Sequence, residues 1–232
     1  MAVTFIAKYE VSSWTTASTP KTASVTTAVG DFLVCLAVTR DAGTTLSSIT
    51  GGTGLSWTLQ TYDEISSTCA VYILTATATT AETFTATGNA VSGGTLGQWG
   101  FSVLRFSGVS SIGAKTVAQS TGAPTLAVST TSANSTLVVV NGDWNAVDGT
   151  SRAYLTNFGT FTEQTYMRQS LGYTVYTGFY ANTGALATSN AGLSAPSGQK
   201  YTIAAVELIG STATYSPPPQ NKMKRLQPYL VR

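Results

Sequence analysis

Histidine is absent from this 232-residue sequence. Without histidine, a chain lacks the usual general base at neutral pH, the usual partner of a serine or cysteine nucleophile, and the commonest metal ligand. Charged residues are also scarce, at 9% of the chain, whereas apolar residues make up 43%. These scarcities argue against catalysis, and we predict a non-enzymatic protein that needs no cofactor.

Cysteines are few, and long apolar runs are missing. The two cysteines, Cys35 and Cys69, lie in apolar runs where a free thiol behaves as a small hydrophobe, although a disulfide between them stays open. Lys8 and Glu10 interrupt the only candidate for a signal peptide, in residues 1–11. No segment has the length of a membrane-spanning helix, so we expect no association with a membrane.

An internal duplication organises the chain. When the sequence is shifted by 104 positions, residues 20–74 align with residues 124–178 without a gap, and 15 of the 55 pairs are identical. The densest match pairs residues 57–62 with residues 161–166. A repeat of this length indicates duplicated domains and not a short-period solenoid.

Strand-like runs recur between turn residues within each repeat. In the first repeat these runs are Thr4–Tyr9, Ala23–Thr27, Phe32–Thr39, Trp57–Tyr62, Cys69–Ala76, Thr83–Thr87 and Gly100–Phe106. Such spacing is typical of a sandwich. We therefore predict an all-β fold of two tandem antiparallel β-sandwich repeats, Ig-like or jelly-roll-like, over residues 1–108 and 109–210. Residues 43–54 and 90–97 are expected to be loops that join strands.

Three segments allow more detailed predictions. Residues 32–38 are apolar on both faces, which is typical of a central strand. Residues 173–180 are rich in tyrosine, and we expect one face in the core and the other toward solvent or a partner. Residues 109–119 echo the first N-terminal strand and should be structured although they join the repeats.

The C-terminal segment, residues 211–232, has a different composition. Three prolines prefer an extended polyproline conformation, and beyond them cations alternate with apolar side chains. We predict an extended arm that docks on a partner, and a frayed tail is the alternative. So few cations would bind nucleic acid only weakly, so none is expected as a partner. The predicted docking residues are Pro217, Pro218, Pro219, Lys222, Lys224, Arg225, Leu226, Tyr229, Leu230 and Arg232.

Other interpretations rest on the second repeat. Trp144, in a loop expected over residues 141–149, and Tyr154 offer flat aromatic faces that suit a sugar ring. The same loop has oxygen-bearing side chains at alternate positions, as Ca²⁺ loops do, although ordinary turns collect the same residues. A third interpretation is a glycosidase that uses Asp143 or Glu163.

Three segments carry a resemblance to a known family. They are Gly-Asp-Phe-Leu-Val at residues 30–34, Ser-Trp-Thr-Leu at residues 56–59, and residues 99–109, with weaker echoes in the second repeat. They resemble tandem β-sandwich virion proteins of tailed bacteriophages, of the minor tail or capsid decoration type. This resemblance implies a structural protein of the virion, made in the host cytoplasm, oligomeric, and docked through its arm to major capsid or tail subunits. The alternative function is an adhesion module that recognises host surface glycans.

Overall fold

A computed structural model describes residues 2–40, 43–65, 69–93, 95–170 and 172–211. These residues form strands, turns and loops but no helix, which confirms the predicted all-β fold. The C-terminal arm predicted from the sequence lies outside the described residues, apart from its first residue, Ser211.

The first half of the chain forms two antiparallel sheets. Its strands are β1 (Thr4–Glu10), β2 (Lys21–Thr27), β3 (Phe32–Arg40), β4 (Thr44–Thr50), β5 (Thr58–Ile65), β6 (Cys69–Thr77), β7 (Glu82–Ser92) and β8 (Trp99–Ser107). The larger sheet has the order β1-β8-β3-β6-β5, and the smaller has the order β2-β7-β4. The predicted central strand, β3, pairs with both β6 and β8, so that prediction is confirmed.

The second half repeats this arrangement strand for strand. Its strands are β9 (Val109–Gly122), β10 (Thr125–Thr130), β11 (Ser135–Asp143), β12 (Ala153–Tyr154), β13 (Phe161–Arg168), β14 (Thr174–Tyr180), β15 (Leu186–Ala195) and β16 (Gln199–Gly210). The two sheets have the orders β9-β16-β11-β14-β13 and β10-β15-β12, which are the first-half orders with eight added to each strand number. The segment that joins the repeats is the long strand β9, as expected.

The strand pairs of each half are nested. In the first half β1 pairs with β8, β2 with β7 and β3 with β6, all antiparallel. The second half pairs β9 with β16, β10 with β15 and β11 with β14 in the same way. A long hairpin whose strands are shared between two sheets in this order is a jelly roll, so the jelly-roll alternative describes each half.

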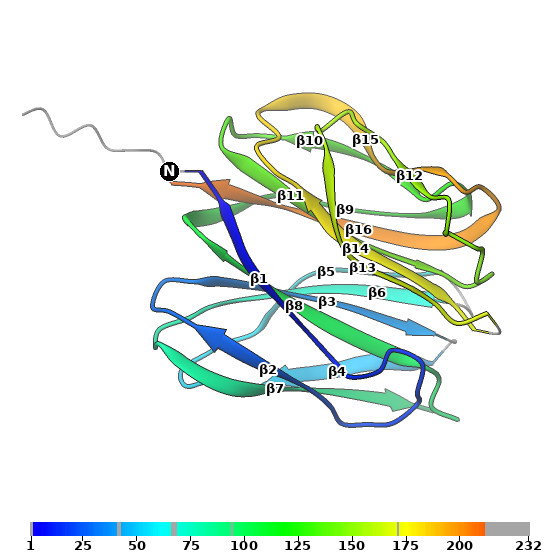
Figure 1. The fold of residues 1–232 in the computed structure, drawn as a ribbon, viewed down its shortest axis with the longest axis horizontal. Coiled ribbons are helices and arrows are strands. Elements are labelled where there is room, and N and C mark those ends of the chain that lie inside the picture. Colours follow the sequence, from blue (N-terminus) through cyan, green and yellow to red (C-terminus); the bar gives the residue numbers. More distant parts are fainter. Residues whose placement is uncertain (1, 41–42, 66–68, 94, 171, 212–232) are drawn as a thin grey trace, which may run out of the picture.

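The two halves pack together as four layers (Figure 1). The five-stranded sheets lie in the middle and face each other, whereas the three-stranded sheets lie on the outside. One hydrophobic cluster accordingly contains residues of both halves, among them Val38 and Val71 with Val140 and Val206. The middle sheets are covered on both faces, which explains why β3, β6, β11 and β14 are buried along almost their whole length.

Aromatic side chains lie at the junction between the halves. The ring of Phe179, on β14, packs at 5.0 Å from the ring of Phe5 and at 5.5 Å from that of Phe106. All of β14 is buried, including the three aromatic residues Tyr176, Phe179 and Tyr180 and the two threonines. The expected second face of the tyrosine-rich run therefore meets the other half of the same chain, and the expectation of solvent there was wrong.

Three further sequence expectations need correction. Residues 44–50 form strand β4 and not a loop, because threonine, leucine and isoleucine in this run pair with β7 at the edge of the smaller sheet. Strand β7 continues to Ser92, so the loop expected from residue 90 begins later. Residues 141–143 belong to β11, so the second-repeat loop begins only at Trp144.

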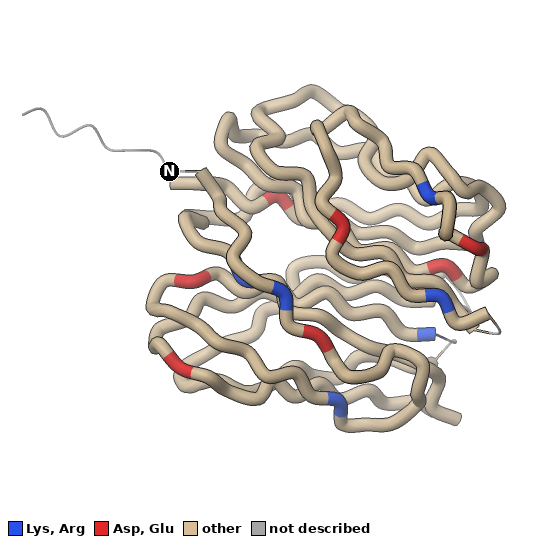
Figure 2. Tube along the Cα trace, viewed as in Figure 1, with Lys and Arg blue, Asp and Glu red and all other residues tan. Residues whose placement is uncertain are grey.

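Cys35 and Cys69 are both free thiols, which answers the open question of a disulfide. Both are buried, as expected for small apolar side chains. Charged positions are few and scattered over the described part of the chain (Figure 2).

Candidate functional site

Every acidic side chain that the structure describes accepts at least one hydrogen bond from the chain itself. The described carboxylates thus stabilise the fold. The Glu163 carboxylate accepts hydrogen bonds from Nε and Nη2 of Arg152 and from the hydroxyl of Tyr154. Burial raises the pKa of Glu163, but these hydrogen bonds outweigh burial and hold the pKa below its ordinary value. A carboxylate engaged in this way is poorly suited to protonate a leaving group.

Asp143 organises the loop that follows β11. Its carboxylate is fully buried and accepts the backbone N–H groups of Asn145 and Val147, both at 2.8 Å. Burial raises the pKa of Asp143 to about 6, against the opposing effect of these hydrogen bonds. The oxygen atoms that the calcium interpretation assigned to an ion are thus used to shape the loop.

Metal-binding clusters are missing from the part of the chain that the structure describes. Within it, no three Asp, Glu or Cys side chains lie close enough together to hold a metal ion. Asp148, the other carboxylate of the loop, accepts hydrogen bonds from Thr150 and lies 3.6 Å from Nη1 of Arg168.

Trp144 lies at the junction of the halves, in a hollow of about 340 Å³. The guanidinium of Arg40, from the end of β3, lies 5.3 Å from the centre of its ring. The ring is partly buried against the shared core, so it is not a free flat platform. The remaining lining residues are Asn145, Ala146, Ser170 and Gly172.

Tyr154, the second predicted sugar-binding residue, belongs to a different site. Its ring stacks on Phe161 with 4.1 Å between centroids, and its hydroxyl donates to Glu163. Tyr154 does not line the hollow of Trp144. The structure therefore does not bring the two predicted residues together.

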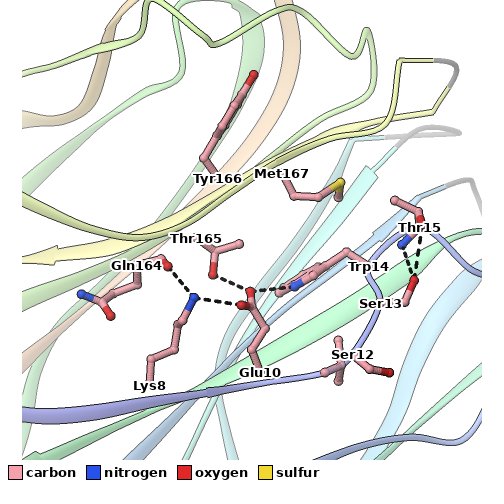
Figure 3. A pocket seen from close by; sticks show the side chains of 11 residues that line it. Lys8, Glu10, Ser12, Ser13, Trp14, Thr15, Gln164, Thr165, Tyr166 and Met167 are labelled. Atoms are coloured by element: carbon pink, nitrogen blue, oxygen red, sulfur yellow. Dashed lines mark hydrogen bonds and ion pairs between the residues drawn. The ribbon is translucent and has the colours of Figure 1, made fainter.

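A larger cleft, of about 440 Å³, opens where β1 meets β13 (Figure 3). Glu10 lies at its centre and accepts Nζ of Lys8 at 2.8 Å, Nε1 of Trp14 at 2.8 Å and Oγ1 of Thr165 at 2.7 Å. Lys8 also donates to the carbonyl of Gln164 at 2.7 Å. The first half supplies the ion pair and Trp14, and the second half supplies Thr165 and the Gln164 carbonyl, so this network joins the two halves.

The segment that follows β1 forms a wall of this cleft. Residues 11–20 do not form a strand. Several of their backbone carbonyl groups accept hydrogen bonds from side chains in other parts of the chain. Gln98 donates to Thr15 and Trp99 donates to Ser18. Trp14 itself packs flat on Gly100, where any Cβ atom would lie 2.5 Å from the indole ring. The cleft thus has fixed walls that carry the hydroxyl groups of Ser12, Ser13 and Thr15.

The cleft was not predicted from the sequence. Lys8 and Glu10 were noted only because they interrupt an apolar run, and Thr165 was noted only as a repeat match. How the two repeats pack decides which residues meet, and no local pattern encodes that packing. The alternation of charge along β1 at a sheet edge is the one signal that pointed to an unusual strand.

The predicted docking residues Pro217, Pro218, Pro219, Lys222, Lys224, Arg225, Leu226, Tyr229, Leu230 and Arg232 all lie outside the described residues. The arm therefore stays a prediction.

Among the described residues, none forms a helix with the length and apolar character needed to cross a membrane. Comparisons of this chain with protein-family models, with curated proteins and with solved structures found no match.

Proposed function

We propose that this chain is a non-catalytic structural protein of a tailed-bacteriophage virion, which decorates the capsid or attaches to the tail. The observation that carries the proposal is the shared core of the two jelly rolls, which makes the chain one rigid body. Every described carboxylate is used within the fold, which favours a structural role over catalysis.

In this proposal the chain docks on other virion proteins through residues 211–232. Cations interleaved with apolar side chains suit an arm that inserts anchors into a groove or adds a strand to a sheet edge. A symmetric assembly multiplies weak contacts of this kind into avidity, so we expect the chain to act as an oligomer on the particle.

Co-sedimentation tests the proposal. The full chain and a version that ends at Thr214 are mixed with phage particles assembled without this protein. We expect the full chain to sediment with the particles and the shortened version to stay in the supernatant. If neither version sediments with particles, the virion role is wrong; if both do, the particle role stands and the arm is not the anchor.

A second candidate function, the recognition of host glycans, is favoured by the hollow around Trp144. The part of the Trp144 ring that lines the hollow, beside a guanidinium and the Asn145 amide, offers a limited apolar contact and hydrogen bonding to a sugar. A glycan array probed with the unmodified chain, with Trp144→Ala and with the control Trp57→Ala tests it. Binding lost only in Trp144→Ala supports this function, and no binding by the unmodified chain excludes the sugars on the array.

A further inference from the structure

The two jelly rolls differ most at one pair of equivalent edges. In each half, one side of the sandwich opens between a strand of the outer sheet and the last strand of the middle sheet. In the first half this is the edge between β4 and β5, called here the first edge. In the second half it is the edge between β12 and β13, called here the second edge. A tyrosine pair marks each edge, Tyr62 stacked on Tyr72 at the first and Tyr166 tilted against Tyr176 at the second.

The second edge is closed by side chains. Tyr154 from β12 stacks on Phe161 from β13, with 4.1 Å between the ring centroids. Arg152 pairs with Glu163 and lies 4.0 Å from the centre of the Tyr166 ring. Aromatic and charged groups thus cover the apolar interior at this edge.

The first edge has no such cover among the described residues. The shift of 104 places Leu59 where the second half has Glu163, and Leu59 is 53% exposed. Tyr62, the counterpart of Tyr166, is 40% exposed. Between β4 and β5 lies a hollow of about 110 Å³, lined by Leu46, Ser47, Ser48, Leu59, Tyr72 and Leu74. Adjacent exposed apolar side chains around a hollow are typical of a surface that another segment covers.

An acidic group flanks this apolar surface. The hydroxyl of Tyr62 donates to Glu64, and the counterpart of Glu64 in the second half is Arg168. Asp63 lies on the opposite face of β5, where it contacts Gln119 of β9. An apolar hollow beside a carboxylate fits a segment that combines apolar side chains with cations, and residues 222–232 have that composition.

The C-terminal segment is long enough to reach the first edge from the point where it leaves the fold. The N–H of Ser211 donates to the carbonyl of Gly108, so the C-terminal segment leaves the fold beside the start of β9. Near the other end of β9, Gln119 contacts Asp63 of β5 at 3.5 Å. The 14 residues of β9 span about 46 Å, whereas 21 extended residues span about 70 Å, so residues 212–232 can cover the distance.

We propose that the first edge is the binding surface for the C-terminal segment, residues 212–232, of this chain. Apolar side chains of the segment cover Leu59 and Tyr62, and its cations lie against Glu64. This inference rests on the docking role that the proposed function gives to the segment. It concerns the free protein, in which the segment binds the first edge of its own chain before any particle surface takes its place.

Photo-cross-linking of the purified full chain tests the inference without any particle. Tyr229 is replaced by p-benzoyl-phenylalanine, the protein is irradiated, and mass spectrometry locates the cross-links. We expect most cross-links within β4 and β5. Links within one chain support the proposal, whereas links found only between two copies would overturn it, and mixing isotopically light and heavy protein separates the two results.

Matched substitutions then test the surface. Leu59→Glu introduces the residue that the second half already has, at an exposed position, so the fold should be kept. We expect it to lower the yield of these cross-links about tenfold, because the loss of apolar burial outweighs the weak attraction between an exposed glutamate and the cations of the segment. The control, Val29→Glu, changes an isolated side chain that is 70% exposed and should leave the yield unchanged.

Two further results would overturn the inference. Cross-links from position 229 that spread over the surface without preference for β4 and β5 exclude a defined binding surface. An equal yield in Leu59→Glu and Val29→Glu excludes Leu59 from it. The cross-linking experiment contains no particles, so its result does not depend on whether the protein binds particles. The co-sedimentation result, in turn, does not depend on where position 229 cross-links.

Discussion

The two halves of this chain share every strand pairing, yet few of their buried side chains are the same. Val38 and Gly142 occupy the same position of the repeat, and they lie against each other at the junction of the halves. A Cβ atom on Gly142 would lie 2.7 Å from Cγ1 of Val38. The comparison teaches that duplication fixed the topology, whereas packing of one copy on the other required unlike residues at equivalent positions.

The largest expected effect comes from giving the second half a residue of the first. Phe179 packs against two other phenylalanine rings, and its counterpart in the first half is Thr75. Phe179→Thr should lower the free energy of unfolding by about 3 to 5 kcal/mol, because it leaves a cavity in the shared core. Urea denaturation measures the loss. The control, Thr75→Ala, should cost less than about 1.5 kcal/mol, and equal losses would show that the junction contributes little.

A pH-dependent effect should distinguish Asp143 from its counterpart, Thr39. Burial raises the pKa of Asp143 to about 6, so the folded state holds this proton more tightly than the unfolded state. The contribution of Asp143 to stability is therefore present below about pH 4 and is lost as the pH rises to about 6, by about 2 to 3 kcal/mol.

Asp143→Asn removes this dependence. The difference in unfolding free energy between the unmodified chain and the variant should fall between pH 4 and pH 6 and stay level above pH 6. Denaturation at a series of pH values measures it. A difference that stays constant across this range would mean that Asp143 titrates alike in both states.

A smaller effect is expected from filling the space at Gly142. In Gly142→Ala the new methyl group would lie 2.3 Å from Sγ of Cys69, so we expect a loss of about 1 to 3 kcal/mol. Cys69→Ala removes that sulfur atom. The double variant should therefore be more stable than the sum of the two single losses predicts, and strict additivity in this double-mutant cycle would contradict the contact.

The smallest expected effect concerns the two cysteines, which should not react at all in the folded protein. Cys35 and Cys69 are free and buried, and burial raises the pKa of the Cys35 thiol well above its ordinary range. Neither thiol should react with a disulfide reagent in the folded protein, and both should react in urea. Reaction of either thiol without urea would show that the shared core opens locally.

The strands were largely predictable because apolar and β-branched residues in period-two runs mark them directly. β3 was identified as central from its two apolar faces, and the repeat was found from residue identities. β4 was missed because its serine and threonine residues, flanked by glycine, resemble a turn. The pattern of β14 predicted a buried face, but it could not tell solvent from a second copy of the repeat on the other side.

The candidate site was far less predictable. Trp144 was noticed as an aromatic residue in a loop, but its contact with Arg40 depends on the packing of the halves. Glu10 and Thr165 are separated by 155 positions and meet only across that junction. A site built at a junction is invisible to local pattern, because the docking geometry and not the spacing brings its residues together.

One feature of the fold governs how the protein is made. A single residue, Gly108 with φ of 75°, lies between β8 and β9, so the first half is complete before any strand of the second exists. At typical translation rates the next 102 residues, 109–210, take about 5 to 20 s to synthesise. During that time the face of the first five-stranded sheet that later packs against the second half is uncovered on the ribosome. Nascent chains of this protein should therefore depend on chaperones during synthesis, although the finished protein exposes little of that face.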